Sequence, residues 1–434
     1  MENALEKIGP HGRVVKDYTV FDDAHPTVIV MHASVGSGHR SAAKAVAEAF
    51  RILREANETV PDDLRIELLD VLELGRIRFD GDKSASSFTG PLRPYYDITW
   101  RYTLTGRLLW GGGTAWSRIM FPSFTQHVKT VKPLAVVATH ITAANVAVGA
   151  RMLSGQSFPI VCVPTDYETE GMWPHKSADL FCVATEAMAE TLRPRKVPEE
   201  CIRITGIPTR SGFSQDYDWQ QTRERFGLPL DKKVVLVLAG AHLPQPYVRF
   251  RSALDQMIPY LHLFSEMQMV FIAGRDGDYA AHLRREKEER NLQNMTVFDY
   301  VEDMAALMAV SDIAICKAGG LTVTECLCAR LPMILLGKAY GQENINVRML
   351  TAAGAASHVT TYRELMVELR RILRNPQVVE AMLLNGGFIR RPNAAEDIAL
   401  AALDLAEREL PKNDPRRKKH FLHFYWGGKP AHTR

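Results

Sequence analysis

Short apolar runs alternate along the chain with longer segments whose apolar residues recur at helical spacing. Runs of this kind, bounded by turn residues, predict buried strands. In the first half of the chain the predicted strands are Thr27–Met31, Arg65–Leu69, Leu134–Val137, Ile160–Val163, Leu180–Ala184 and Ile202–Thr205. A helical pattern, Ser41–Glu55, follows the first of them. Strands separated by helices predict a parallel sheet with crossover helices.

The same pattern restarts after Gly206-Ile207-Pro208. The second set of predicted strands is Val234–Leu238, Met269–Ala273, Met295–Phe298, Ile313–Cys316 and Met333–Leu335. We therefore expect two α/β domains with doubly wound sheets, spanning residues 24–207 and 208–410, and a tail at 411–434. Ligands of such sheets bind beyond the carboxyl ends of the strands, so the functional residues are expected just after each strand.

Composition narrows the class of protein. The chain has 434 residues, 46% of them hydrophobic and 24% charged, which is typical of a soluble globular protein of two or three domains. A net charge of +3 is too small to indicate a nucleic-acid partner. The six cysteines form no C-x-x-C pair and no zinc-ligand spacing, so the expectation is a reducing cytosol and no structural metal.

No stretch approaches the ~18 apolar residues of a membrane span, and Met1–Lys16 is polar without an apolar signal core. The expected location is cytoplasmic. A membrane, if it is met at all, would be met at its surface.

A glycine-rich turn follows the first strand and opens the first helix, and it includes Gly36, Ser37, Gly38 and His39. Such a turn lets a ligand approach the backbone. It is not a P-loop, because no Lys-Ser/Thr pair follows, and Ser41 replaces the third glycine of a dinucleotide fingerprint. His39 is either a helix-capping side chain or a group that handles a hydroxyl proton or positions an acceptor.

A second glycine turn, Lys317–Glu325, follows the strand Ile313–Cys316. Gly319 and Gly320 at a helix N-terminus suit a diphosphate, and the Thr322 hydroxyl could add a donor. Glu325 could accept hydrogen bonds from a ribose diol, or could form a capping box with Thr322. The polar segment Gly341–Asn346, which contains Gln342, follows the next strand and could read the hydroxyls of a sugar.

Together these motifs resemble those of a known enzyme family. The pattern Gly-Gly-Leu-Thr-x-x-Glu at 319–325, followed by Pro332 and by Gly-Gln-Glu-x-x-Asn at 341–346, is similar to the donor signature of the MurG-like (family 28) glycosyltransferases. The Gly-x-Gly-His-x-x-Ala-Ala turn at 36–43, Thr165-Asp166-Tyr167 with Trp173, and 206–210 resemble the branch of monogalactosyldiacylglycerol synthases and processive diacylglycerol glucosyltransferases.

The resemblance implies a GT-B fold, in which two Rossmann-like domains face each other across a cleft. It implies that a UDP-sugar binds the C-terminal domain and a lipid acceptor the N-terminal domain. The implied donor site is Gly319, Gly320, Thr322, Glu325, Gln342 and Asn346, and the implied acceptor site is Gly36, Ser37, Gly38 and Trp173. His39 and Asp166 are the candidate catalytic residues, although Asp166 could be a simple turn aspartate.

Two segments depart from the family pattern. Residues 239–246 replace the glycine-rich loop that usually follows the first C-terminal strand, so contacts near the donor phosphates could differ. Residues 168–172 lack the histidine that lipid-glycosylating relatives tend to carry after the Thr-Asp pair, which leaves the choice of acceptor open.

Two segments combine aromatic and basic residues, Tyr95–Trp116 and the tail Pro411–Arg434. Aromatic side chains suit a bilayer interface, and basic clusters are attracted to anionic lipid. The alternatives are a buried helical pair for the first segment and a solvated, disordered tail for the second.

The sequence therefore predicts a hexosyltransferase that transfers a sugar from a UDP-sugar to a lipid, with diacylglycerol favoured, at the inner face of the cell membrane. No cofactor or metal is expected, since a helix N-terminus can stabilise the leaving diphosphate. The alternatives are a UDP-sugar 2-epimerase, a transferase acting on another acceptor such as a polyprenyl lipid, and a non-catalytic nucleotide-sugar-binding protein.

Overall fold

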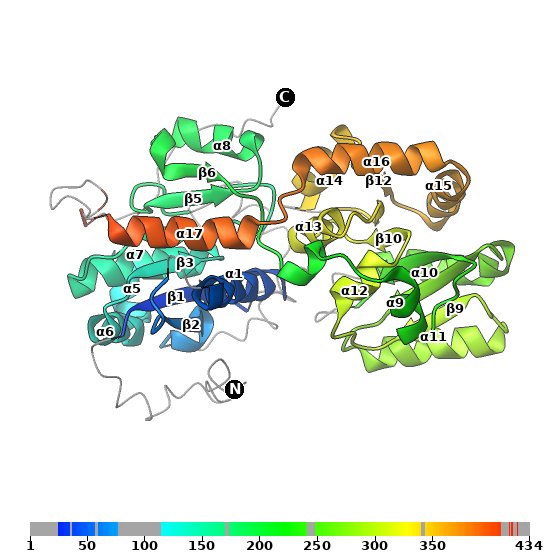
Figure 1. Cartoon of the computed structure of the whole chain (residues 1–434), viewed down its shortest axis with the longest axis horizontal. Coiled ribbons are helices and arrows are strands. Elements are labelled where there is room, and N and C mark those ends of the chain that lie inside the picture. Colours follow the sequence, from blue (N-terminus) through cyan, green and yellow to red (C-terminus); the bar gives the residue numbers. More distant parts are fainter. Residues whose placement is uncertain are drawn as a thin grey trace. The chain divides into compact units, whose positions relative to one another are not determined.

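The computed structural model describes residues 25–34, 37–56, 60–76, 114–169, 173–240, 248–339, 343–408, 416, 418–419 and 423. The chain divides into two compact units (Figure 1). The first comprises residues 1–210 together with 393–434, and the second comprises 211–392. Each unit contains a six-stranded sheet whose paired strands are all parallel.

The first sheet has the strand order β2-β1-β3-β4-β5-β6. Its strands are β1 (Thr27–His32), β2 (Arg65–Asp70), β3 (Ala135–Ala138), β4 (Ile160–Cys162), β5 (Leu180–Val183) and β6 (Ile202–Ile204). The helices of this unit are α1 (Ser37–Ala56), α5 (Thr114–Met120), α6 (Pro122–Val131), α7 (Ile141–Ser154), α8 (Glu186–Leu192) and α17 (Ala394–Glu407). Short 3₁₀ helices are η2 (Val71–Leu74), η3 (Arg193–Arg195) and η4 (Glu199–Cys201).

Helix α17 is the last helix of the described chain, and it packs in the first unit (Figure 1). Ile398 and Ala402 on this helix are fully buried in one hydrophobic core with Val30 of β1 and Val46 of α1. The predicted second domain, 208–410, therefore differs from the structure at its carboxyl end. The physical reason is that the apolar face of α17 is buried against α1 and β3, a pairing that local sequence pattern does not encode.

The second sheet has the strand order β12-β11-β10-β7-β8-β9. Its strands are β7 (Lys233–Leu238), β8 (Met267–Ile272), β9 (Met295–Phe298), β10 (Ile313–Cys316), β11 (Met333–Leu336) and β12 (Ala356–Val359). Its α-helices are α9 (Trp219–Arg225), α10 (Val248–Met257), α11 (Gly277–Glu289), α12 (Met304–Ala309), α13 (Gly320–Cys328), α14 (Glu343–Ala352), α15 (Tyr362–Arg374) and α16 (Pro376–Ile389). The 3₁₀ helices are η5 (Ser211–Ser214) and η7 (Ile258–Leu263).

Every predicted strand is present, with ends that differ by at most two residues. One further strand, β12, was not predicted. It is an edge strand, and its Ser357 and His358 are not buried, so it lacks the apolar run that marks the others.

The strand order places a topological switch point in each sheet. In the first unit the chain moves outward in opposite directions from β1 and β3, and in the second unit from β7 and β10. Crevices at such points, beyond the carboxyl ends of the strands, are where open α/β sheets bind ligands. Both predicted glycine turns follow strands at these switch points.

The described part of the tail contacts the first unit. The Arg416 Nε atom lies 3.9 Å from Asp179 Oδ1, and the Arg416 guanidinium donates to the Cys201 Sγ atom at 3.4 Å. His423 is fully buried, and its carbonyl oxygen accepts from the Lys176 amide at 2.9 Å. Part of the tail is thus docked on the domain rather than solvated, whereas Lys418 and Lys419 are exposed.

The aromatic segment Tyr95–Trp116 lies almost wholly outside the described residues, which resume at Thr114. Its predicted membrane contact stays a prediction. All six cysteines are buried and form no disulfide bond, as expected for small apolar core residues. None of the described helices is both long enough and apolar enough to span a bilayer.

Candidate active site

His39 lies in the first turn of α1 and contacts the exits of two neighbouring strands. Its Nδ1 atom lies 3.0 Å from the Thr139 carbonyl oxygen, just after β3, and 2.8 Å from the Thr165 hydroxyl, just after β4. The Thr139 hydroxyl in turn donates to the His39 carbonyl oxygen at 2.9 Å. A carbonyl only accepts, so Nδ1 carries the proton and Nε2 keeps its lone pair. His39 is therefore not a helix cap but a histidine oriented as a potential base.

Two further histidines, His140 and His32, lie near His39. The rings of His39 and His140 meet edge to face with centroids 4.6 Å apart, and His140 Nδ1 accepts from the Thr142 amide at the start of α7. His32 ends β1, where it pairs in register with Asp70.

Burial keeps these histidines neutral. Burial lowers the pKa of His39, and the negative charge of Asp166 only partly opposes that effect. Burial also lowers the pKa of His32 to about 4 against the attraction of Asp70. The pKa of His140 falls well below its ordinary value because of burial and the neighbouring histidines. At neutral pH a neutral His39 is competent to accept a proton.

Asp166 follows β4 and is half-buried. Its charge acts on the His39 imidazole, so the structure brings the two candidate catalytic residues into electrostatic contact. Asp166 could take the proton itself or could orient and stabilise His39, and both roles stay predictions.

The predicted acceptor-binding residues fall in different places. Ser37 and Gly38 open α1 beside His39, and Gly36 lies outside the described residues. Trp173 is 6% exposed and packs edge to face with Phe181, with ring centroids 6.4 Å apart. Core packing accounts for this ring, and its acceptor role stays a prediction.

The second glycine turn leads into α13. Gly319 is the N-cap residue in an extended conformation and supplies no side-chain hydrogen bond, so α13 begins at Gly320. The first backbone N–H groups of this helix are left for an anion. Thr322 lies inside the helix rather than at its N-cap, which contradicts the capping-box alternative for Glu325. The half-buried Glu325 follows Thr322 by almost one turn.

Two residues of helix α14 contact this turn. Asn346 is fully buried, and its Nδ2 atom donates to the Ala318 carbonyl oxygen at 2.8 Å. The Lys317 Nζ atom lies 2.8 Å from Glu343 Oε1. Asn346 thus fixes the shape of the turn, and its predicted contact with the donor stays a prediction. Gln342 lies outside the described residues.

The turn after β7 contributes a close approach of two backbones. A Cβ atom on Gly240 would lie 3.0 Å from the Gly274 Cα atom, after the neighbouring strand β8, so only glycine fits there without a shift. The Arg251 guanidinium donates to the Ala239 carbonyl oxygen at 3.0 Å and pairs with Asp276 at 2.5 Å. Residues 241–247, where the sequence departs from the family, lie outside the described residues.

Sequence reasoning missed three positioning contacts, from Thr139, Thr165 and Arg251. Thr165 belongs to the Thr165-Asp166-Tyr167 motif, but no local pattern indicates that its hydroxyl contacts a histidine far away in sequence. Among the described residues no group of three or more His, Cys, Asp or Glu side chains could hold a metal ion.

Family models match both units. Residues 39–209 match the monogalactosyldiacylglycerol (MGDG) synthase model, and residues 234–385 match the glycosyltransferase family 28 C-terminal domain. Relatives named processive diacylglycerol beta-glucosyltransferase occur in several Bacillus species. The Bacillus cytotoxicus protein is 25% identical over 92% of this chain and 99% of its own length. The Bacillus pumilus protein is 28% identical over 57% of this chain, and that match spans 63% of the relative, just under two thirds.

Solved structures share the fold. MurG of Acinetobacter baumannii is 18% identical, with a TM-score of 0.53 over 87% of this chain and 99% of that one. UDP-GlcNAc 2-epimerase of Neisseria meningitidis is 14% identical, with a TM-score of 0.55 over 87% of this chain and 100% of that one. The comparisons confirm the predicted resemblance, the two-domain GT-B fold and the enzyme class, a hexosyltransferase.

Proposed function

We propose that this enzyme transfers a hexose from a UDP-sugar to the hydroxyl group of diacylglycerol at the inner surface of the cell membrane. The first unit would bind the lipid acceptor near His39, and the second would bind UDP at α13. The observation that carries the proposal is the contact of the His39 Nδ1 atom with the Thr139 carbonyl oxygen at 3.0 Å, because a proton on Nδ1 leaves Nε2 able to accept one. The relatives named as diacylglycerol glucosyltransferases support this acceptor.

The reaction would proceed by a single displacement. The acceptor oxygen forms a bond to the anomeric carbon while the bond from that carbon to the β-phosphate oxygen of UDP breaks. His39 Nε2 takes the acceptor proton, with Asp166 stabilising the imidazolium that results. UDP leaves with the bonding electron pair, and the N–H groups at the start of α13 stabilise its charge.

The test is a transfer assay with radiolabelled UDP-glucose and UDP-galactose. The purified full chain is incubated with vesicles that contain diacylglycerol, and the lipids are then extracted. Label in a monohexosyl or oligohexosyl diacylglycerol is the expected result. If a polyprenyl lipid is also supplied and only that lipid is labelled, the acceptor is the polyprenyl lipid and not diacylglycerol. Formation of free UDP and an epimerised sugar without labelled lipid would favour the epimerase alternative and overturn the proposal.

A further inference from the structure

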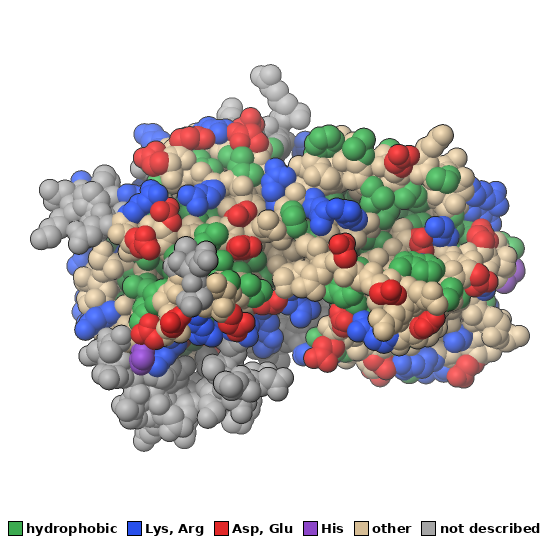
Figure 2. Space-filling view, in the orientation of Figure 1, with side chains coloured by type: hydrophobic (Ala, Val, Ile, Leu, Met, Phe, Trp, Pro, Cys, Tyr) green, Lys and Arg blue, Asp and Glu red, His purple; other side chains and the backbone are tan. Residues whose placement is uncertain are grey.

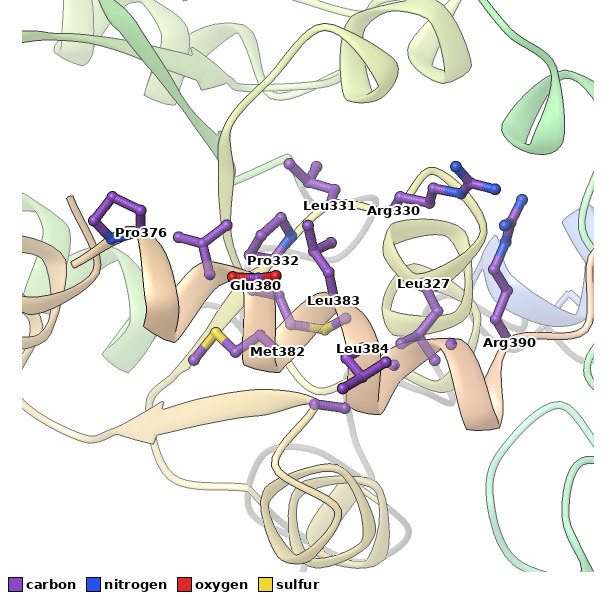
Figure 3. Close-up of a pocket in the computed structure, with 15 residues that line it drawn as sticks. Leu327, Arg330, Leu331, Pro332, Pro376, Glu380, Met382, Leu383, Leu384 and Arg390 are labelled. Carbon is purple, nitrogen blue, oxygen red and sulfur yellow. The ribbon is translucent and has the colours of Figure 1, made fainter. Parts of the chain in front are cut away.

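The second unit has a groove lined by residues of α13, α16 and the segment between α13 and β11 (Figure 3). It has a volume of about 690 Å³ and lies between the last turn of α13 and helix α16. Pro332 and Ala355, which line it, directly precede β11 and β12. The groove is therefore at the amino ends of these strands, whereas Gly319 and Gly320 follow the carboxyl end of β10.

The groove is lined mainly by apolar side chains. The apolar side chains in this lining include Leu327, Leu331, Met333, Val379, Met382, Leu383 and Leu384. Its volume falls in the range of small-ligand sites, ~300–1,000 Å³. A groove with this lining and volume has room for a hydrocarbon chain.

Two arginines lie together at one end of the groove. Figure 3 shows Arg330, just after α13, and Arg390, at the end of α16, extending toward each other there. The Nε atom of Arg390 is buried and has no hydrogen-bond partner among the described residues. Glu380, the one carboxylate in the lining, is ten residues before Arg390, or about 15 Å along the helix axis. Two guanidinium groups side by side, one with a buried Nε–H that has no partner among the described residues, indicate an anion site.

The surface beside the groove is apolar and exposed. Leu384 is 65% exposed and Phe388 is 74% exposed, both on α16. Figure 2 shows hydrophobic side chains gathered over α16, next to Lys and Arg side chains. Arg391, also exposed, follows this helix directly. Apolar side chains flanked by arginines are typical of a helix that lies at a lipid interface.

We propose that this groove binds an anionic membrane phospholipid and thereby docks the second unit on the bilayer. The lipid phosphate would pair with Arg330 and Arg390, an acyl chain would occupy the apolar groove, and Leu384 and Phe388 would enter the interface. A free phosphate would leave the groove empty, and a neutral lipid would leave both guanidinium groups unmatched. The inference rests on the proposed function only in placing the enzyme at a membrane.

The test uses co-sedimentation of the full chain with phosphatidylcholine vesicles, with and without phosphatidylglycerol. The charge variant is Arg330→Gln with Arg390→Gln. Its control is Arg285→Gln with Lys287→Gln on α11, which removes the same charge from the same unit. We expect the charge variant to bind anionic vesicles at least tenfold more weakly and the control to change little, since basic residues near anionic lipid act over only about a Debye length.

A second pair of variants tests the apolar contact. Leu384→Gln with Phe388→Gln should weaken vesicle binding at least tenfold, whereas Val367→Gln, which changes a side chain 68% exposed on α15, should not. Calorimetry with short-chain phosphatidylglycerol below its micelle concentration should detect binding that the charge variant loses. Inorganic phosphate alone should not compete. Competition by phosphate would instead identify a free-anion site and overturn the lipid assignment.

UDP affinity of every variant reports correct folding, because the donor turn lies beyond the other end of the sheet. Equal vesicle binding by the charge variant and its control, or no binding by the unmodified enzyme, would overturn the proposal. Capture of an acidic protein in place of vesicles would do the same. If vesicle binding depends on the arginines but no labelled glycolipid forms, the docking surface stands and the proposed function fails.

Discussion

The Nδ1 atom of His39 lies 3.0 Å from the carbonyl oxygen of Thr139, a residue one hundred positions later in the chain. This contact joins α1 to the exit of β3 at the switch point of the first sheet. Because the carbonyl cannot donate, the contact decides which ring nitrogen carries the proton. The protonation pattern of the candidate base is thus set by the fold of the first unit.

We expect loss of His39 or Asp166 to impair turnover without impairing donor binding. His39→Ala should lower kcat by roughly 10²–10⁴-fold, the usual contribution of a positioned base, and Asp166→Asn should also lower it. UDP affinity should change little, because the donor turn belongs to the other unit. Exposed His262 supplies the control, His262→Ala. Normal turnover in both variants at saturating acceptor would show that this site is not catalytic.

The pH dependence of kcat/KM offers an independent check on His39. A base must be unprotonated, and burial lowers the pKa of His39 below its ordinary 6.5. The rate should therefore stay level as the pH falls to about 6.5 and decline only at lower pH. An acid limb with its midpoint above 6.5 would assign the proton transfer to another group.

Glu325→Ala should weaken UDP binding by about 1–3 kcal/mol, the cost of losing a hydrogen bond to a charged group. Calorimetric titration measures this, with Glu289→Ala on α11 as the control. Because α13 begins at Gly320, the change removes no capping box. Undiminished UDP affinity would leave Glu325 without a role in the donor site.

Asn346→Ala should destabilise the second unit and weaken UDP binding together. It frees the Ala318 carbonyl that Asn346 holds at 2.8 Å, and a lost buried hydrogen bond costs about 1–3 kcal/mol. Asn346→Asp should behave alike, since a carboxylate cannot donate. Urea denaturation and UDP titration measure the two effects, with exposed Asn344→Ala as the control. A variant that is stable yet binds UDP poorly would indicate direct contact with the donor.

Acid should destabilise the first unit through His32. Its pKa is 6.5 when unfolded and about 4 when folded, so between these values the unfolded chain binds more protons and stability falls as the pH falls. The loss from pH 7 to pH 5 is about 2 kcal/mol for this residue. Amide hydrogen exchange of β1 measures it. His32→Asn should reduce the pH dependence, and an unchanged dependence would contradict the assignment.

The sequence predicted the parts of the structure that local pattern encodes. Runs such as Ile313–Cys316 are apolar because both faces of a parallel strand are buried, and the ends of these strands were predicted to within two residues. The edge strand β12 was missed because half-buried Ser357 and exposed His358 interrupt its apolar pattern. The residues of both glycine turns were identified, but the hydrogen bonds of Thr139 and Arg251 join elements far apart in sequence, and no spacing rule reports them.

The return of α17 to the first unit has a consequence for biosynthesis. During synthesis the ribosome releases residues 1–210 well before residues 394–407, so β1 and α1 keep an uncovered apolar face until α17 has been made. The second unit is continuous from 211 to 392 and can complete its core sooner. Domains that emerge first usually fold first, and here the order in which the cores close is reversed. A chain that stops before α17 would leave the core of the first unit open to aggregation or proteolysis.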